Sequence, residues 1–232
     1  MHKLIVFDLD GTLAPIGKGM LNEDIVKLRE LEIAGYRIAI CSGKPTFYLC
    51  GFMRQIGLQK PSLVGENGAV IQYGVEVPPE RFYICPHSER AAEQLRRMRE
   101  RITASCGDRV WFQPNEVELT PFPKDAEAFE LIQELVDEHP DDVDELLVYR
   151  QVDCFDFIPK NINKAQGLAY LAELEGLTRA DFVVVGDGIN DVPMFEFADV
   201  SVGIGGKLEY ETTYSFEKIG DALEKLLCKE IN

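Results

Sequence analysis

The chain has no paired cysteines and no long apolar segment. Its six cysteines are scattered along 232 residues, and none belongs to a Cys-x-x-Cys pair. In a chain of this length, such cysteines predict free thiols in a reducing compartment. No charged and then apolar leader with a cleavage site is present, and no apolar run approaches membrane-spanning length. We therefore expect a cytoplasmic protein with no membrane partner.

Positive charge is also in short supply. Lysine and arginine number 24 against 40 aspartates and glutamates, and the formal net charge is −16. Such a surface repels polyanions, which argues against nucleic acid as a partner. A phosphate-bearing substrate would need local positive charge from a metal ion and one or two lysines. The composition is otherwise that of a globular protein, with 46% hydrophobic and 28% charged residues.

Several continuous apolar runs, rich in β-branched residues, predict buried parallel strands. They are "LIVF", "YRIAIC", "FVVVG" and "DVSVGIG". Segments with apolar residues at helical spacing separate them, and one such helix has Asn22 as its expected N-cap. This alternation predicts an α/β fold with a doubly wound, Rossmann-like parallel sheet.

Between residues 79 and 159 the pattern changes to short strands with one apolar face. Segments such as "RFYIC" and "LLVYRQ" are typical of such strands, and two amphipathic helices lie among them. The order of elements suits an open antiparallel sheet with helices on one face. We therefore expect an α+β module at 79–159, inserted into a core formed by 1–78 and 160–232.

Polar clusters follow the predicted core strands. They lie at 8–12, 42–44 and 186–191, and a fourth pair, Asn163 and Lys164, begins a helix. Ligands of open parallel sheets bind beyond the carboxyl ends of the strands. Segments far apart in the sequence are therefore expected to meet in one crevice.

The clusters supply four aspartates, which would repel one another strongly without a cation: Asp8, Asp10, Asp187 and Asp191. Carboxylate and carbonyl oxygens are the hard ligands that suit Mg²⁺. Each motif alone also matches a solvated turn, because Asp-Gly is a common turn pair. Two such motifs after two buried strands favour a metal site.

Positively charged and hydrogen-bonding groups accompany these acids. Lys164 follows the expected N-cap Asn163, where it is either a surface lysine or part of an anion seat at a helix amino terminus. Ser42 and Gly43 also precede a helix, although a serine there often serves only as a cap. An anion seat, a divalent cation and a carboxylate together indicate phosphoryl transfer.

Together these motifs resemble those of the haloacid dehalogenase superfamily of aspartate-nucleophile phosphatases. The matching segments, in order, are "DLDGT", "CSG", "NK" and "GDGIND", and they span nearly the whole chain. The module between the second and third motifs is similar to the cap of the Cof-like subgroup. Its short length, with "CSGK" and "LVGENGAVI", is similar to the phosphoglycolate phosphatase branch. Lys44 departs from the pattern, because many relatives carry arginine there.

The resemblance implies a role for each candidate residue. Asp8 would attack phosphorus and form an aspartyl-phosphate. Asp10 would protonate the leaving alkoxide and then deprotonate the hydrolytic water. Mg²⁺ would be held by Asp8, the main-chain carbonyl of Asp10 and Asp187, with Asp191 as a direct or more distant carboxylate. The remaining candidates are phosphate- or substrate-binding residues: Ser42, Gly43, Lys164, Asn67 and Asn190.

These residues predict a Mg²⁺-dependent phosphatase that hydrolyses a small phosphomonoester, either phosphoglycolate or a sugar phosphate. The alternatives are a sugar phosphomutase or phosphotransferase of the same superfamily, or a non-catalytic phosphometabolite-binding protein. The inserted module would act as a lid that selects the substrate. Its candidate selectors also match ordinary surface or core residues: Arg81, His87, Arg109, Trp111 and Arg150. An exposed sheet face in the module could pair chains, so a monomer and a homodimer both stay open.

Overall fold

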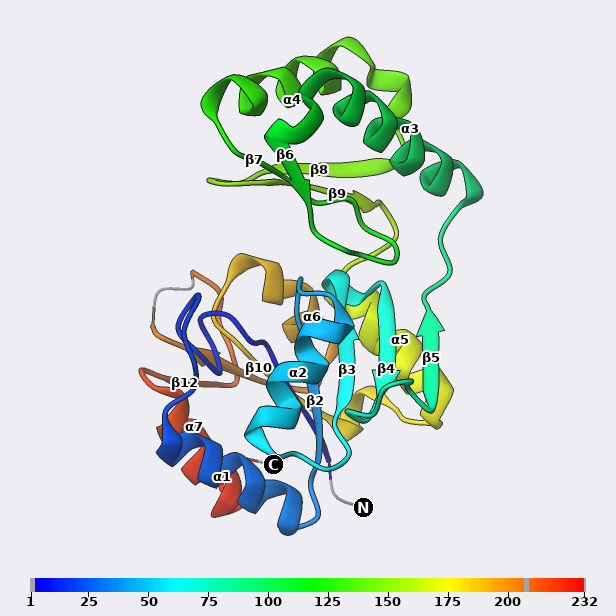
Figure 1. Ribbon diagram of the computed structural model, residues 1–232. Helices are drawn as coiled ribbons and strands as arrows, with labels where there is room; N and C mark the ends of the chain where they lie inside the picture. The colour runs from blue at the N-terminus through cyan, green and yellow to red at the C-terminus, as the bar shows by residue number, and fades with distance from the viewer. Residues whose placement is uncertain (1–2, 207–208, 232) are drawn as a thin grey trace. The chain divides into compact units, whose positions relative to one another are not determined.

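The computed structural model describes residues 3–206 and 209–231. The chain forms two units, each with its own cluster of buried apolar side chains (Figure 1). One unit, here called the core, comprises Met1–Cys85 and Asn163–Asn232. The other, here called the insert, comprises Pro86–Ile162. The predicted α/β class with an inserted α+β module is confirmed.

The core is built on an eight-stranded sheet in the order β12-β11-β10-β1-β2-β3-β4-β5. Neighbouring strands are parallel from β12 to β3 and antiparallel between β3, β4 and β5. The central strands are continuously buried, as their apolar runs predicted. The strands are β1 (Leu4–Phe7), β2 (Arg37–Cys41), β3 (Ser62–Gly65), β4 (Val70–Tyr73), β5 (Arg81–Ile84), β10 (Phe182–Gly186), β11 (Val200–Ile204) and β12 (Tyr214–Phe216).

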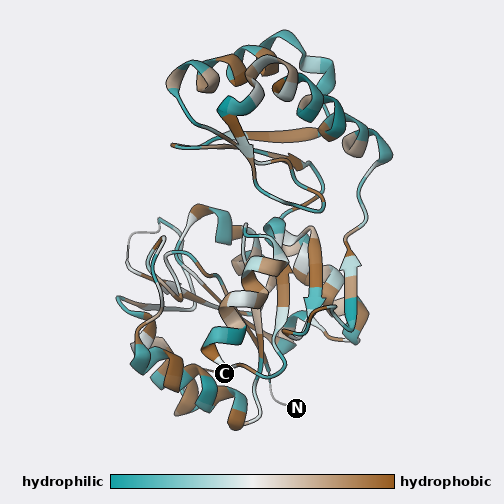
Figure 2. Ribbon diagram, viewed as in Figure 1, coloured by the Kyte–Doolittle hydropathy of each residue, from teal (hydrophilic) through white to brown (hydrophobic). Residues whose placement is uncertain are grey.

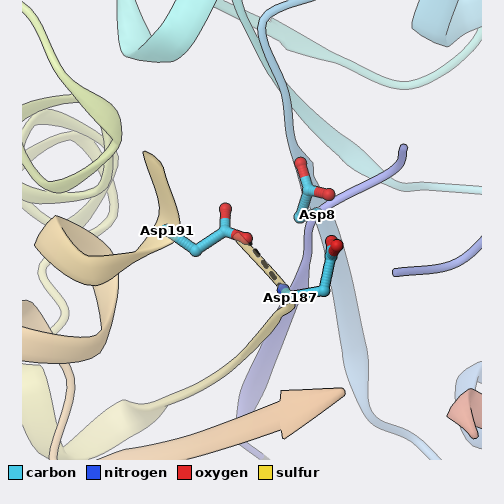
Figure 3. Close-up of side chains that lie close together, drawn as sticks. All are labelled: Asp8, Asp187 and Asp191. Atoms are coloured by element: carbon cyan, nitrogen blue, oxygen red, sulfur yellow. Dashed lines mark hydrogen bonds between the residues drawn. The ribbon is translucent and has the colours of Figure 1, made fainter. Parts of the chain in front are cut away.

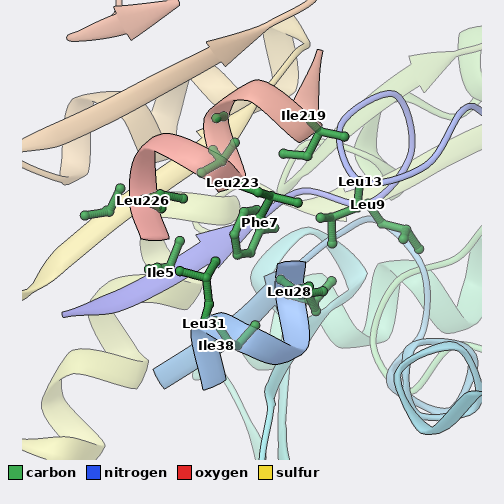
Figure 4. Close-up of a cluster of buried hydrophobic side chains, with 14 of the residues drawn as sticks. Ile5, Phe7, Leu9, Leu13, Leu28, Leu31, Ile38, Ile219, Leu223 and Leu226 are labelled. Atoms are coloured by element: carbon green, nitrogen blue, oxygen red, sulfur yellow. The ribbon is translucent and has the colours of Figure 1, made fainter. Parts of the chain in front are cut away.

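Helices cover both faces of this sheet (Figure 1). On one face, α1 and α7 pack together with α2 over alternate side chains of β1, including Ile5 and Phe7 (Figure 4). On the other face, α5 packs against β3 and β4, and α6 packs against β10 and β11. The core helices are α1 (Asn22–Ile33), α2 (Thr46–Ile56), α5 (Lys164–Glu175), α6 (Val192–Phe197) and α7 (Ile219–Leu227).

The two expected N-caps have different outcomes. Asn163 caps α5, because its side-chain oxygen accepts a hydrogen bond from the Gln166 amide at 3.0 Å. The prediction for Asn22 is wrong, since α1 begins at Asn22 itself and Leu21 holds the cap position without a side-chain cap. Helix α1 packs against α7.

The insert consists of two helices over two antiparallel strand pairs (Figure 1). The pairs are β6–β7 and β8–β9, and a single bridge between Leu119 and Phe157 joins them. The expected open antiparallel sheet is therefore split into two parts. The elements are α3 (Glu89–Cys106), β6 (Val110–Phe112), β7 (Pro121–Pro123), α4 (Ala126–Glu138), β8 (Leu146–Arg150) and β9 (Phe155–Pro159).

The boundary between the units differs from the expected one. The segment "RFYIC" was expected to open the module, but β5 pairs with β4 in the core sheet, with Tyr83 opposite Ile71. The units therefore divide after residues 85 and 162 rather than after 78 and 159. The reason is that β5 is an edge strand with mostly exposed side chains, so its pattern matches that of a half-exposed insert strand.

Hydropathy distinguishes buried strands from helices in both units. In Figure 2, β3 of the core and β8 of the insert are largely brown, whereas α1 of the core and α3 and α4 of the insert mix teal and brown. Among the described residues, no helix combines the length and the apolar character needed to cross a membrane.

Candidate active site

The site begins where two neighbouring strands end. β1 and β10 are parallel and in register, with Phe7 opposite Val185, so the residues that follow them emerge at the same edge of the sheet. The amide of Asp8 donates to the carbonyl of Val185 at 2.9 Å, which extends the pairing by one residue. Asp8 and Asp187 are thereby placed side by side (Figure 3).

Three carboxylates meet at this edge (Figure 3). One oxygen from each of Asp8, Asp187 and Asp191 lies within 4.8 Å of the others, and Asp8 and Asp191 are buried. Asp191 comes from a 3₁₀ turn, Ile189–Asp191, and its Oδ2 accepts hydrogen bonds from the amides of Asp187 and Gly188, both at 2.9 Å. Asp191 therefore holds the loop that carries Asp187.

Lys164 is buried among these carboxylates. Its Nζ donates to Oδ1 of Asp8 at 2.6 Å and to Oδ1 of Asp191 at 2.5 Å. The side chain is only 1% exposed, so the alternative of a solvated surface lysine is ruled out. The first turn of α5 thus delivers an ammonium group to the end of β1.

Burial and mutual repulsion shift the ionisation of the cluster. Burial raises the pKa of Asp8 to about 6, against the opposing effect of Lys164, and the charge of Asp191 adds to the rise. Burial also raises the pKa of Asp187, and the Thr12 hydroxyl opposes this shift. Burial alone would lower the pKa of Lys164, but the carboxylates of Asp8 and Asp191 outweigh it and raise that pKa. Three carboxylates against one ammonium leave an excess of negative charge.

Two further residues of the first motif, Gly11 and Thr12, shape the cluster, and the sequence analysis gave neither a role. Thr12 donates its hydroxyl to Oδ1 of Asp187 at 2.7 Å. Gly11 has φ +96°, and a Cβ atom there would overlap the Asp187 carboxylate. Both residues belong to the "DLDGT" segment, so the motif itself was the sequence signal that could have identified them.

A second group of residues gathers at the end of β2. Ser42 is buried, and its main-chain carbonyl accepts the amide of Asn67 at 3.0 Å. A Cβ on Gly43 would lie 3.2 Å from Oδ1 of Asn67, so the Asn67 side chain lies against this loop. Asn67 belongs to the 3₁₀ turn Glu66–Gly68 that follows β3. The predicted residues Ser42, Gly43 and Asn67 are thus brought together.

Close backbone packing connects this group to α5. A Cβ on Gly68 would overlap the main-chain carbonyl oxygen of Asn163, and one on Gly167 would lie 2.5 Å from Cα of Gly68. The turn after β3 and the first turns of α5 therefore touch without intervening side chains. This contact fixes the helix that carries Lys164.

Asp10 and Asn190 lie outside the carboxylate cluster, although the charge of Asp10 is close enough to raise the pKa of Asp187. The Asp10 side chain does not belong to the three-carboxylate group, and its Oδ2 forms an ion pair with Nζ of Lys44 at 3.4 Å. Asn190 is exposed on the 3₁₀ turn, with its Oδ1 beside Gly188. Within the part of the chain that the structure describes, Lys164 donates to Asp8 and Asp191 but not to Asp10 or Asn190.

A family model for haloacid dehalogenase-like hydrolases matches residues 5–79 and 113–208. The chain belongs to this family. Solved structures agree, since a haloacid dehalogenase-like hydrolase from Bacteroides thetaiotaomicron superposes with a TM-score of 0.75 at 20% identity, covering 97% of this chain and 100% of that one. A Thermotoga maritima crystal structure has a TM-score of 0.77 at 19% identity, covering 100% and 98%. The predicted family is confirmed.

Curated relatives of this hydrolase carry phosphatase names. A phosphoglycolate phosphatase from Methanopyrus kandleri is 26% identical over 205 residues, covering 87% of this chain and 84% of that protein. A 5-amino-6-(5-phospho-D-ribitylamino)uracil phosphatase from Bacillus subtilis is 24% identical over 216 residues, covering 88% and 84%. These names agree with the predicted class, a phosphoric monoester hydrolase.

The carboxylate cluster of the hydrolase fits a divalent cation. Its donors are hard oxygens, which suit ions such as Mg²⁺, and its net charge is negative. Both oxygens of Asp191 already accept hydrogen bonds from Lys164 and the loop amides. Asp8 and Asp187 are therefore better placed than Asp191 to bind an ion directly.

The candidate selectors of the inserted module have contacts of their own. Arg109 pairs with Asp125 and Glu127, and Arg150 pairs with Glu130. Trp111 is 52% exposed and packs on Phe122 with ring centroids 5.4 Å apart. Arg81 lies in the core, where its guanidinium sits 3.6 Å from the ring centroid of Tyr73.

Proposed function

We propose that this hydrolase is a Mg²⁺-dependent phosphatase acting on a small phosphomonoester through an aspartyl-phosphate. The observation that carries the proposal is the setting of Asp8. This carboxylate is buried at the end of β1, one of its oxygens accepts a hydrogen bond from Lys164, and Asp187 lies beside it. Such a setting suits a nucleophile held in one orientation beside a cation site.

Each residue of the cluster has a proposed task. Lys164 engages Oδ1 of Asp8, which leaves Oδ2 to attack phosphorus. Asp8, Asp187 and the main-chain carbonyl of Asp10 would hold Mg²⁺, while Asp191 fixes the loop. When bound, the cation supplies positive charge that keeps Asp8 ionised and balances the phosphoryl oxygens.

Further groups are proposed to bind the phosphoryl oxygens. An ammonium has three N–H donors, and Lys164 uses two of them on Asp8 and Asp191, so one is left for the substrate. Oγ of Ser42 accepts the amide of Lys44 at 3.2 Å, so its hydroxyl hydrogen can donate to an anion. Gly43, Asn67 and Asn190 would complete the binding of the substrate around this loop.

Asp10 is proposed as the acid–base catalyst. It follows Asp8 by two residues, and its side chain is 25% exposed, so it can exchange protons with an ester oxygen and with water. It would give a proton to the leaving alkoxide and recover one from the water that hydrolyses the aspartyl-phosphate.

The proposed substrate is phosphoglycolate, with sugar phosphates as the second class. Relatives named for phosphoglycolate and for a phosphoribityl compound support these two choices. We assign the choice between them to the insert, as a lid. All six cysteines are free thiols, and this supports the proposed cytoplasmic location.

The test is Asp8→Asn, assayed for phosphate release from a panel of phosphomonoesters with Mg²⁺ and with chelator. Activity should fall to background while the fold is retained, because the amide is not a nucleophile. Asp24→Asn is the matched control, since Asp24 is also a buried core aspartate but lies on α1. Full turnover by the Asp8→Asn protein would overturn the proposal. Transfer to an added sugar hydroxyl in preference to water would indicate a phosphotransferase instead.

A further inference from the structure

We infer that Lys44 is a positioning residue that orients the Asp10 carboxylate, an inference that rests on the proposed function. Lys44 follows the Ser42-Gly43 pair, and its ammonium lies 3.4 Å from Oδ2 of Asp10. Among residues 3–206 and 209–231, Lys44 is the one cation that forms an ion pair with Asp10. The two side chains come from loops that follow different strands, β2 and β1.

The backbone of Lys44 is held on both sides. Its amide donates to Oγ of Ser42 at 3.2 Å, and its carbonyl accepts the amide of Glu66 at 3.1 Å. A Cβ on Gly65 would lie only 2.8 Å from that carbonyl oxygen, so the two loops are in close contact. The lysine therefore extends from a fixed point, and the reach of its ammonium is limited.

The backbone of Asp10 is also fixed, whereas its side chain is not. Asp10 forms a bridge with Ala14, and the next amide, that of Gly11, donates to the Ala14 carbonyl at 2.7 Å. The carboxylate itself is 25% exposed and stands outside the cluster of Asp8, Asp187 and Asp191. Without a partner it could rotate freely into solvent, and the ion pair with Lys44 selects one orientation.

The ion pair gives the two carboxylate oxygens of Asp10 different roles. Lys44 binds Oδ2, which leaves Oδ1 to carry the proton. In the first step this proton passes to the ester oxygen as the bond from phosphorus to that oxygen breaks and the bond to Asp8 forms. In the second step water gives a proton to Oδ1 while its oxygen attacks phosphorus, and the bond to Asp8 breaks. Both steps need Oδ1 within hydrogen-bond reach of the reacting oxygen.

The effect should fall on catalysis rather than on stability. Lys44 is 39% exposed, and exposed ion pairs contribute little to stability. Lys44→Met is therefore expected to fold normally and to lower kcat for an alkyl phosphate, such as phosphoglycolate or glycerol phosphate, by about tenfold, part of the usual acid–base contribution. KM should stay unchanged, because Lys44 acts through Asp10 and not on the substrate.

The aryl ester p-nitrophenyl phosphate gives a sharper readout. Its leaving phenolate needs no proton, so Asp8 is still phosphorylated quickly in the Lys44→Met protein, while the second step, which needs the base, is slow. Rapid mixing should show a burst of about one nitrophenolate per enzyme, followed by slow turnover. Lys44→Arg should restore the wild-type kinetics, because it returns a cation. Lys60→Met, which removes an exposed lysine from the same unit, is the control and should leave kcat, KM and the burst unchanged.

Three results would overturn the inference. They are wild-type kcat on the alkyl ester, a rise in KM without loss of kcat, and slow turnover on p-nitrophenyl phosphate without a burst. If Lys44→Met fails to fold, Lys44→Gln serves in its place, because it keeps a long polar side chain without the charge. An inactive Asp8→Asn protein beside an unaffected Lys44 variant would refute only this inference. An active Asp8→Asn protein would refute the proposed function itself.

Discussion

Lys164 in the core and Arg96 in the insert are paired cations in opposite surroundings. In the core, Lys164 is 1% exposed and bonds two buried carboxylates at the end of the central strand. In the insert, Arg96 of α3 pairs at the surface with Glu93 and Glu100, whereas Arg97 and Arg101 pair with the buried Asp142. Breaking a buried pair leaves a charge without compensation, whereas breaking a surface pair exposes two groups that water already solvates. Replacing Lys164 should therefore be costly, and replacing Arg96 should be tolerated.

The largest effect is expected from Lys164→Met. The carboxylates of Asp8 and Asp191 would stay buried without their cation, so the free energy of unfolding should fall by about 3–5 kcal/mol, and activity should be lost. Urea denaturation in the presence of a chelator measures this loss. Arg96→Met in the insert is the matched control and should leave the urea midpoint nearly unchanged. Equal losses in the two proteins would refute the contrast.

The next effect concerns a divalent cation. Mg²⁺ at about 100 times its dissociation constant should stabilise the wild-type protein by about 2.7 kcal/mol, because it binds the folded state. Thermal unfolding with Mg²⁺ and with EDTA measures the shift. Asp187→Asn should abolish the shift, whereas Asp125→Asn in the insert should retain it. If Mg²⁺ still raised the unfolding temperature of the Asp187→Asn protein, the ion would bind at another site.

Two glycines with positive φ provide a finer comparison. Gly11→Ala combines backbone strain with overlap of the Asp187 carboxylate, so it should cost about 1–3 kcal/mol and lower kcat. Gly107 in the insert also has positive φ, but a Cβ there meets nothing within 4 Å. Gly107→Ala should therefore lose stability through strain alone and keep kcat. Chemical denaturation and steady-state kinetics on both proteins separate strain from overlap.

The smallest effect is a pair of pH dependences with opposite signs. Burial raises the pKa of Asp24 in the core above 3.8, so its contribution to stability is lost as the pH rises from 3.8 through the folded-state pKa. Hydrogen bonding from Arg109 lowers the pKa of Asp125 in the insert from 3.8 to about 2, so its contribution is lost as the pH falls through that range.

Denaturation curves across the acid range would measure both. Asp24→Asn should remove the loss that appears on raising the pH, and Asp125→Asn should remove the loss that appears on lowering it. Parallel pH profiles for the two variants would contradict these assignments.

The parallel sheet of the core was largely predictable from the sequence. Its continuous apolar runs are typical of strands that helices cover on both faces. β1 and β10 are buried throughout, and three of the four acids predicted to meet beyond them, Asp8, Asp187 and Asp191, lie together, whereas the Asp10 side chain lies outside the group. The edge strand β5 was misassigned because its side chains are mostly exposed, so its composition carries no signal of the sheet it joins.

The side-chain contacts between distant segments were the feature of the site that the sequence predicted least well. The burial of Lys164 depends on the path of α5 against the turn after β3, which no local pattern encodes. The contact of Thr12 with Asp187 spans 175 positions, and that of Lys44 with Asp10 joins two loops whose approach only the folded sheet defines. The division of the insert into two strand pairs likewise follows from tertiary packing rather than from alternation.

The contact between Gly68 and Gly167 has a consequence for how this hydrolase can change over evolutionary time. Main chain rests on main chain there, so any larger residue at either position must displace α5. Lys164 lies one turn earlier on that helix, and an α-helix advances about 1.5 Å per residue, so even a shift of one residue would draw its ammonium out of reach of Asp8. Two residues that have no side chain and touch no reacting atom thus constrain which descendants of this protein can remain active.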